Sequence, residues 1–425
     1  MIKNLIMVSQ AYVHYATPQS LERAAAQARL TVVLHGDELV YPRLEPYVSE
    51  VHRLTGLTRY NLQPSFTPDD LAEVVTSEMQ LTGGDPAEVA LFCQHEDNVL
   101  PTAQVRHRFG IAGDSPDLIC RFRDKIAMKE ALAPHLPDAL PRYRRLAVDR
   151  IAADAAAYHA ELVDLLGSQR LIVKPTAGAG SVNVAVISSP DDLVQVAERI
   201  SADSRAFEYE VDELLEGTMH QCDSFVRDGK VVFSGILELG CSNFDFVQGQ
   251  PLSVYPVTDE VLYRQLFDYN QDVITALGFR DGSTHHELFL RRDAEGRPVP
   301  RFLEIAARVP GGLGIPFHER NSGINLMDAN LLLALGDPAV VHLAPQIRNN
   351  VVSALLPVGH GTVVARNEPT VTSPYTIDWR VSIGDVVNSQ SLIDNAGILT
   401  LINNDPTALR KDFESLASYV PVTCE

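Results

Sequence analysis

The hydrophobic pattern of the first 110 residues alternates between strand-like and helix-like segments. Short apolar runs typical of buried strands are KNLIMVS (3–9), LTVVLHG (30–36) and EVALFCQ (88–94). Helical composition and periodicity occur in PQSLERAAAQARL (18–30) and in TAQVRHRFG (102–110), which Gly110 closes. This alternation of strands and helices predicts a parallel sheet.

The pattern changes after about residue 120, where strands pair as antiparallel hairpins with helices between them. Predicted strands include LIVKP (171–175), KVVFSGILEL (230–239), HHELFLRR (285–292) and RFLEIAAR (301–308), and predicted helices include DKIAMKEAL (124–132) and 259–277. Beyond about residue 345 the chain is rich in strands and ends on a helix. We therefore predict an α/β and α+β multidomain protein, with an N-terminal α/β domain at 1–115, a central α+β domain at 116–340 and a β-rich C-terminal unit at 341–425.

Two charged residues interrupt the apolar strand FLEIAARV (302–309). Strand alternation places Glu304 and Arg308 on one face together with Phe302 and Ala306, and it places the apolar Leu303, Ile305, Ala307 and Val309 on the other. If the hairpin folds symmetrically about Glu295-Gly296, Glu287 lies opposite Glu304. Two facing, half-buried carboxylates need a cation or a shared proton, and Mg²⁺ is the simplest solution, with Mn²⁺ as a substitute. The alternative is two solvated glutamates on an exposed sheet face.

A glycine-containing loop follows the strand that ends near Lys174. Its sequence, TAGAGS (176–181), has Gly178 and Gly180, which allow backbone N–H groups to approach phosphate oxygens. The segment lacks the GxxxxGK[ST] pattern of a Walker A loop, and a strand rather than a helix follows it, unlike a Rossmann turn. It therefore predicts either a flexible hairpin over phosphates or an ordinary glycine-rich turn.

Two further segments are candidates for nucleotide contacts. Asp124 suits the N-cap of the helix that follows, which places Lys125 in the first turn, where the helix dipole disfavours a cation. That lysine either points at an anion or reaches into solvent. The segment EVDELLEG (210–217) is a strand end that could present backbone groups to an adenine edge, or simply run into a turn.

Composition and charge exclude several functional classes. The net charge of −20 argues against nucleic-acid binding, because counterion release needs clustered Lys and Arg. No apolar run is long enough to cross a membrane, and the N-terminus does not resemble a signal peptide. Five cysteines without a CxxC pair predict reduced thiols and a cytoplasmic protein. His285 and His286 lack the spaced partners of a zinc site.

In this order, the motifs resemble the ATP-grasp ligase superfamily, and within it the dipeptide-forming L-amino acid ligases of the bacilysin type. The stretches that carry the resemblance lie between about residues 85 and 335: RDK (123–125), VKPTAGAGS (173–181), DELLEG (212–217), THHE (284–287) and LEIAAR (303–308). The resemblance implies a fold in which two α+β subdomains clasp ATP, with a nucleotide flap at about residues 142–210.

The resemblance also implies roles for individual residues. Lys125 and Lys174 would hold ATP phosphates, with Gly178, Gly180 and Ser181 in the loop above them. Glu213 and Leu215 would form the adenine hinge, Glu287 and Glu304 would bind Mg²⁺, and Arg308 would lie near the acyl phosphate. Many relatives carry Asn where this chain has Ala306, and the resemblance leaves Asp223 and His220 as alternatives for the ribose contact. Glu96 and Glu238 are weaker candidates for recognising a substrate ammonium, Gly311 and Gly312 would let the backbone approach the substrate, and Phe244, Phe246 and Tyr255 would line a pocket or belong to the core.

The implied activity is ATP-dependent ligation of an amino acid carboxylate to an amine, most simply a second amino acid, with ADP and phosphate as products. One alternative is a ligase that loads an amino acid onto a carrier protein or an amino sugar. Another is a nucleotide-binding regulatory protein without turnover. The implied partners are small amino acid or amine substrates, and a homodimer is left open.

Overall fold

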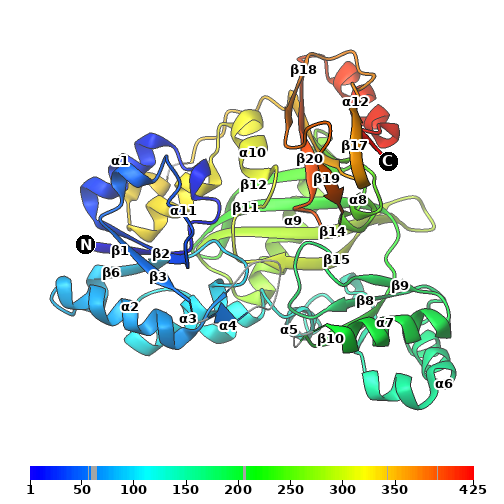
Figure 1. The fold of residues 1–425 in the computed structure, drawn as a ribbon, viewed down its shortest axis with the longest axis horizontal. Helices are drawn as coiled ribbons and strands as arrows, with labels where there is room; N and C mark the ends of the chain where they lie inside the picture. Colours follow the sequence, from blue (N-terminus) through cyan, green and yellow to red (C-terminus); the bar gives the residue numbers. More distant parts are fainter. Residues whose placement is uncertain (56, 59–64, 204–206, 342, 390) are drawn as a thin grey trace.

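A computed structural model describes residues 1–55, 57–58, 65–203, 207–341, 343–389 and 391–425 (Figure 1). The chain begins with a four-stranded parallel sheet of order β3-β2-β1-β6. Its strands are β1 (Asn4–Val8), β2 (Arg29–His35), β3 (Glu50–Leu54) and β6 (Val89–Phe92). The predicted parallel sheet is confirmed. A short hairpin, β4 (Leu57–Thr58) and β5 (Ser65–Phe66), follows β3.

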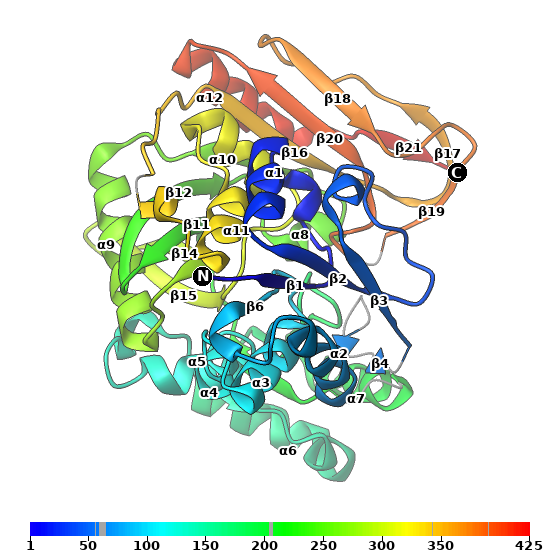
Figure 2. The ribbon, with the colours of Figure 1, turned by 90° about the vertical axis from the view of Figure 1, so that its left-hand side faces the viewer.

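Helices cover both faces of this sheet, which explains why its central strands β1 and β2 are buried and mostly apolar, whereas the edge strand β3 is partly exposed. One face packs on α1 (Pro18–Gln27) and α11 (Leu326–Ala334), and the other on α2 (Pro68–Leu81) and α3 (Val99–Phe109). Figure 2 shows α1 and α11 side by side above the sheet. Because α11 lies more than 200 residues beyond β6, the core of the N-terminal sheet is completed by a distant part of the chain.

A small antiparallel sheet of order β7-β10-β8-β9 forms the region expected as the nucleotide flap. Its strands are β7 (Tyr143–Arg145), β8 (Leu171–Pro175), β9 (Ala185–Ile187) and β10 (Tyr209–Glu213). Its apolar face packs on α6 (Val148–Leu166) and α7 (Pro190–Ala202), which lie below the sheet in Figure 1. Its separate core makes it a packing unit of its own.

The largest sheet has the order β15-β14-β11-β12-β13-β16-β20-β18. In chain order its strands are β11 (Thr218–Arg227), β12 (Lys230–Leu239), β13 (Leu252–Pro256), β14 (Gly282–Arg292), β15 (Pro298–Ala306), β16 (Val351–Pro357), β18 (Tyr375–Trp379) and β20 (Asn395–Ile402). Helix α9 (Glu260–Leu277), together with α5 (Lys125–Leu132), packs on one face. The hydrogen bonds of the sheet therefore run across the boundary proposed at residue 340.

The remaining elements surround these sheets. They are α4 (Pro116–Cys120), α8 (Asn243–Val247), α10 (Gly314–Ser322), α12 (Pro406–Ser415) and the three-stranded sheet of β17 (His360–Arg366), β19 (Val386–Asn388) and β21 (Val422–Cys424). Within the described ranges, every helix is too short or too polar to span a bilayer.

Candidate active site

The described residues enclose a cavity of about 530 Å³ between the small sheet and the β11–β15 part of the large sheet. All nine residues predicted to contact ATP or metal line it: Lys125, Lys174, Gly178, Gly180, Ser181, Glu213, Leu215, Glu287 and Glu304. They come from α5, β8 and the loop after it, the end of β10, and the neighbouring strands β14 and β15. Residues separated by up to 179 positions (125 to 304) therefore share one cleft.

The two glutamates meet as the hairpin pattern predicted. Glu287 on β14 pairs directly with Glu304 on β15. The register shifts immediately beyond this pair, because Leu288 pairs with Phe302 and leaves Leu303 as an extra residue in β15. A β-bulge of this kind interrupts the alternation of side chains. The predicted face is therefore wrong at Phe302, which is fully buried in the core under α9, whereas Leu303 lines the cavity beside Glu304.

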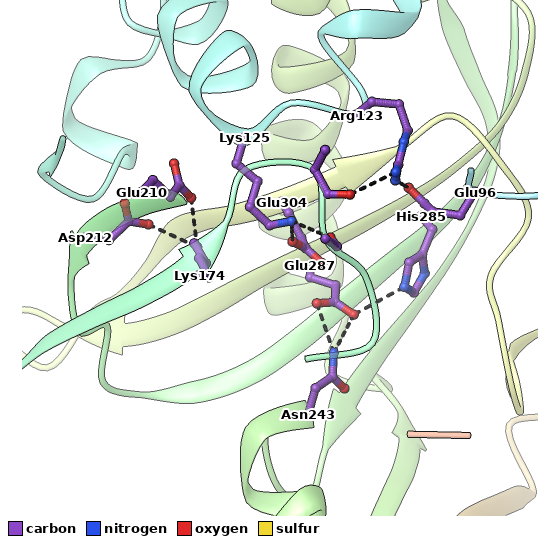
Figure 3. A network of polar contacts seen from close by, with 12 residues as sticks. Glu96, Arg123, Lys125, Lys174, Glu210, Asp212, Asn243, His285, Glu287 and Glu304 are labelled. Carbon is purple, nitrogen blue, oxygen red and sulfur yellow. Dashed lines mark hydrogen bonds and ion pairs between the residues drawn. The ribbon is translucent and has the colours of Figure 1, made fainter. Parts of the chain in front are cut away.

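Three polar side chains orient Glu287. The amide of Asn243 donates to both carboxylate oxygens at 2.9 and 3.2 Å, and His285 Nε2 lies 3.2 Å away (Figure 3). Gln221 donates to the same carboxylate at 3.2 Å. Asn243 also lines the cavity. The sequence analysis missed it, although Ser242 and Asp245 around it form a capping box, the signal of a helix start.

His285 belongs to a buried polar chain that continues behind Glu287. Its Nδ1 lies 2.6 Å from Asp223, whose other oxygen lies 2.7 Å from His318. Burial alone would lower the pKa of His285, but the Asp223 carboxylate raises it to about 9. The two candidates for ribose contact, Asp223 and His220, are both buried and are not among the residues that line the cavity.

Lys125 connects the metal candidate Glu304 to the glycine loop. Asp124 caps α5 by accepting from the backbone N–H of Ala127 at 2.8 Å, as predicted. Lys125 is buried rather than extended into solvent, and its Nζ lies 2.8 Å from Glu304 and 2.8 Å from the carbonyl oxygen of Gly178. Burial alone would raise the pKa of Glu304, but Lys125 and Lys174 lower it. An ionised Glu304 is the form that binds a cation.

Lys174 lies in a buried cluster that the sequence analysis did not predict. Its Nζ is 3.0 Å from Asp212 and 3.5 Å from Glu210, and Lys129 lies 2.7 and 2.9 Å from the same two carboxylates. Burial alone would lower the pKa of Lys174, but Asp212, Glu210 and Glu304 together raise it. The sequence pattern that could have predicted this cluster is a pair of acids at alternate positions of a buried strand, Glu210 and Asp212, whose side chains share a face.

Part of the cavity wall is apolar and suits a flat aromatic base. Its apolar side chains include Ile172, Val184, Val186, Leu214, Met219, Phe244, Phe289 and Leu303. Glu213 is held at its edge by Arg301, at 2.6 Å, and by the backbone N–H of Arg142, at 3.1 Å. Of the three aromatic residues left open between pocket and core, Phe244 lines the cavity, whereas Phe246 and Tyr255 are buried in hydrophobic clusters.

The candidates for substrate contact lie outside this cavity lining. Arg308, just beyond β15, contacts Glu96 and donates to the carbonyl oxygen of Val309 at 2.8 Å. Burial alone would raise the pKa of Glu96, but Arg308 and Arg123 hold it well below its usual range. Glu96 is thus an anion shared by two guanidinium groups at the carboxyl end of β6.

Gly311, Gly312 and Glu238 have different surroundings. A side chain at Gly311 would meet the Tyr12 hydroxyl at 3.2 Å, and Gly312 has a φ of 54° and accepts from the Tyr15 hydroxyl at 3.2 Å. Glu238 forms a two-pronged ion pair with Arg410 of α12, at 2.6 and 2.9 Å. The structure therefore does not bring Glu238 together with the other candidates.

Sequence comparison identifies the domain that builds the cleft. Residues 168–316 match the ATP-grasp domain. The chain contains an ATP-grasp domain. The matched residues include Lys174, the glycine loop, both glutamates and Arg308, so the site motifs fall within the ATP-grasp match, whereas Lys125 and Glu96 precede it.

Curated proteins and solved structures agree with this assignment. The chain is 25% identical over 272 residues to the L-arginine-specific L-amino acid ligase of Bacillus subtilis, a match that covers 63% of this chain and 62% of that ligase. In fold it resembles the L-amino acid ligase of Bacillus licheniformis, with a TM-score of 0.71, 17% identity and coverage of 100% and 99% of the two chains. It also resembles N5-carboxyaminoimidazole synthase of Aspergillus clavatus, solved with ADP and 5-aminoimidazole ribonucleotide, with a TM-score of 0.65, 13% identity and 98% coverage of each chain.

These findings confirm the fold class and the resemblance that the motifs indicated. The chain carries an ATP-grasp domain at residues 168–316 and has distant similarity to the L-amino acid ligases of Bacillus. ATP-grasp carboxylate–amine ligases are the enzymes it resembles in both sequence and fold.

Proposed function

We propose that the chain is a carboxylate–amine ligase that uses ATP and Mg²⁺ to join an amino acid to an amine, most simply a second amino acid. The observation that carries the proposal is that the paired carboxylates Glu287 and Glu304 share one cleft with Lys125 and Lys174, while Arg308 lies four residues beyond Glu304, just past the end of β15. A binding module for nucleotide alone would not need Arg308 beyond the metal candidates. The similarity to L-amino acid ligases supports the choice of amino acids as substrates.

The residues of the cleft fit both ATP and Mg²⁺. Glu287 and Glu304 are adjacent cross-strand carboxylates, and hard oxygen donors of this kind are what Mg²⁺ takes from proteins, with phosphate oxygens completing its shell. The apolar wall and the two lysines suit a base and a phosphate chain respectively. At Gly178 an added Cβ would lie 2.9 Å from the Pro175 ring, so only glycine fits the loop here without a shift.

The proposed reaction has two steps, with ATP and Mg²⁺ supplying the phosphoryl group and charge neutralisation. A carboxylate oxygen of the first substrate attacks the γ-phosphorus, and ADP leaves, which produces an acyl phosphate. The amine nitrogen of the second substrate then attacks the carbonyl carbon, phosphate leaves, and the amine loses a proton to solvent. Lys125 and Lys174 hold phosphate oxygens, Arg308 holds the charge that develops on the carbonyl oxygen, and the glycine loop excludes water.

The direct test is a phosphate-release screen over pairs of amino acids with ATP and Mg²⁺, followed by mass spectrometry of the products. A product mass equal to the sum of two amino acids minus water is expected for at least one pair. Phosphate release with no condensed product would point to another acceptor, such as a carrier protein or an amino sugar. Nucleotide binding without release in any pair would contradict the proposal and favour a regulatory protein.

The spent nucleotide is expected to be ADP, with phosphate as the second product. Two lysines and the glycine loop line one cavity with Glu287 and Glu304, so they would hold the terminal phosphates and the glutamates would hold Mg²⁺, which favours cleavage at the γ-phosphorus. Chromatography of the nucleotide after turnover measures this. A stoichiometric AMP peak would be incompatible with the proposed mechanism.

The loop from Thr176 to Ser181 is expected to become more ordered when ATP and Mg²⁺ bind. Ser181 has a φ of 58°, a left-handed conformation that is uncommon for a residue with a side chain. Phosphate contacts to the loop backbone would stabilise it. Hydrogen exchange of peptides covering 176–181, with and without ATP and Mg²⁺, should show slower exchange in the complex. Equal and strong protection in both states would make the loop a rigid hairpin.

A further inference from the structure

Three successive carbonyl groups of the glycine loop accept hydrogen bonds from one short segment, residues 123–125. The backbone N–H of Lys125 donates to Thr176 at 2.9 Å, the Arg123 guanidinium donates to Ala177 at 2.9 Å, and Lys125 Nζ donates to Gly178 at 2.8 Å. These contacts hold the side of the loop that follows β8. Residues 123–125 therefore fix the position of the first three residues of the loop.

Arg123 also binds the N-terminal domain. Its guanidinium contacts the carboxylate of Glu96 and lies 3.0 Å from Asp97, both in the segment that follows β6. Its side chain is 9% exposed, and Asp97 is 6% exposed. Figure 3 shows Arg123 on the far side of Lys125 from Lys174, in contact with Glu96. One buried guanidinium thus joins the acid pair Glu96–Asp97 to the carbonyl of Ala177.

Of these three donors, the Lys125 ammonium is the one that also lies where it could bind phosphate. Lys125 lines the cavity, whereas Arg123 does not. When the Lys125 ammonium turns to phosphate, the carbonyl of Gly178 loses its donor. The contacts at Thr176 and Ala177 do not depend on that ammonium and remain. Arg123 would then be the side chain that holds the start of the loop in place while the tip of the loop moves.

We propose that Arg123 is a positioning residue that couples the acid pair Glu96–Asp97 to the glycine loop. The planar guanidinium has donors on several edges, so it can bind two carboxylates and a carbonyl at once. Disturbing the acid pair should therefore loosen the loop through Arg123. This inference rests on the proposed function only in taking the loop to close over ATP phosphates.

The first measurement uses the nucleotide-free, full-length chain, so it does not depend on any activity. Hydrogen exchange of peptides covering 176–182 is compared among wild type, Arg123→Met, Asp97→Asn and the control Arg121→Met. Loss of a hydrogen bond from a charged group should accelerate exchange about tenfold or more in Arg123→Met, with a smaller change in Asp97→Asn. Arg121 lies two residues away and donates instead to Leu277, at 3.2 Å, so its replacement should leave the loop unchanged.

The second measurement separates coupling from a merely structural role. ATP affinity in the presence of Mg²⁺ is measured by calorimetry for Arg123→Met, Asp97→Asn and the double variant. If Asp97 acts through Arg123, the double variant should bind ATP no more weakly than Arg123→Met alone, whereas independent effects would multiply. Arg123→Lys, with one point charge, should recover only part of the loop protection.

The outcomes distinguish the two proposals. Unchanged loop exchange in a folded Arg123→Met variant, or exchange that rises equally over the whole chain, would overturn the coupling. If Arg123→Met does not fold, Arg123→Lys and Asp97→Asn carry the same comparison, and normal loop exchange in both would overturn it. Failure of wild type to bind ATP would instead contradict the proposed function, while the loop measurement without nucleotide would still decide the role of Arg123.

Discussion

Replacing Arg308 with alanine is expected to lower kcat by about 10²–10³ while leaving ATP affinity close to that of wild type. Arg308 lies beyond the last residue of β15, Ala306, and it is not among the residues that line the nucleotide cavity. Its guanidinium is fixed by Glu96 and by the carbonyl of Val309. A donor oriented in this way before the reaction stabilises charge that appears only during it, which is why turnover rather than ATP binding should suffer.

Two comparison variants make this expectation specific. Arg308→Lys should restore little turnover, because a point charge cannot reproduce the planar arrangement of guanidinium donors. Glu304→Ala should weaken Mg²⁺-dependent ATP binding as well as turnover, since Glu304 lies inside the cavity. The measurements are kcat and the Kd for ATP, with folding checked by thermal melting. Near-normal turnover in Arg308→Ala, or a loss of ATP affinity as large as that of Glu304→Ala, would refute the assigned role.

Replacing Lys129 with methionine is expected to lower the free energy of unfolding by about 3–5 kcal/mol. Lys129 is fully buried and lies 2.7 Å from Asp212 and 2.9 Å from Glu210. With Lys174, it makes the cluster electrically balanced, with two ammonium groups and two carboxylates. Methionine keeps most of the volume but leaves two buried carboxylates with a single cation, and an uncompensated buried charge costs far more than the lost contact.

Urea unfolding followed by circular dichroism measures this change, with Lys411→Met as the matched control. Lys411 is exposed on α12, so its replacement should alter the free energy of unfolding by less than about 0.5 kcal/mol. A destabilisation of Lys129→Met as small as that of the control would show that the acids find another partner or are protonated. Because Lys174 shares both acids, Lys129→Met should also weaken ATP binding in the molecules that remain folded.

The sequence by itself determined the features that depend on neighbouring residues. Gly110 ends α3 in a left-handed conformation, with a φ of 66°, because that position favours glycine, and the Asp124 side chain starts α5. The turn near Glu295-Gly296 set the hairpin itself, but Glu287 meets Glu304 only because of the bulge at Leu303, since the residues beside the turn pair one position out of that register, Arg292 with Pro298. The two helix boundaries follow from local backbone chemistry within a few residues.

The order of the motifs, read as a resemblance, indicated the ATP-grasp fold and the residues of the cleft. The prediction of side-chain faces was wrong where a strand departs from regular alternation. The bulge at Leu303 moved that side chain into the cavity and Phe302 into the core. Strand β11 was not predicted, because its buried positions include His220, Asp223 and Ser224, which do not look like a strand core.

Only the tertiary structure decided which charges meet. Lys129 joins Glu210 and Asp212, Asn243 reaches Glu287, and Arg123 links Asp97 to Ala177, across separations of up to 83 residues. No local periodicity encodes such pairs, since a charged side chain looks the same in sequence whether it is solvated or paired. Burial makes the difference, because a charge removed from water must find an opposite charge or a polar group, and the packing of the sheets determines which one lies within reach.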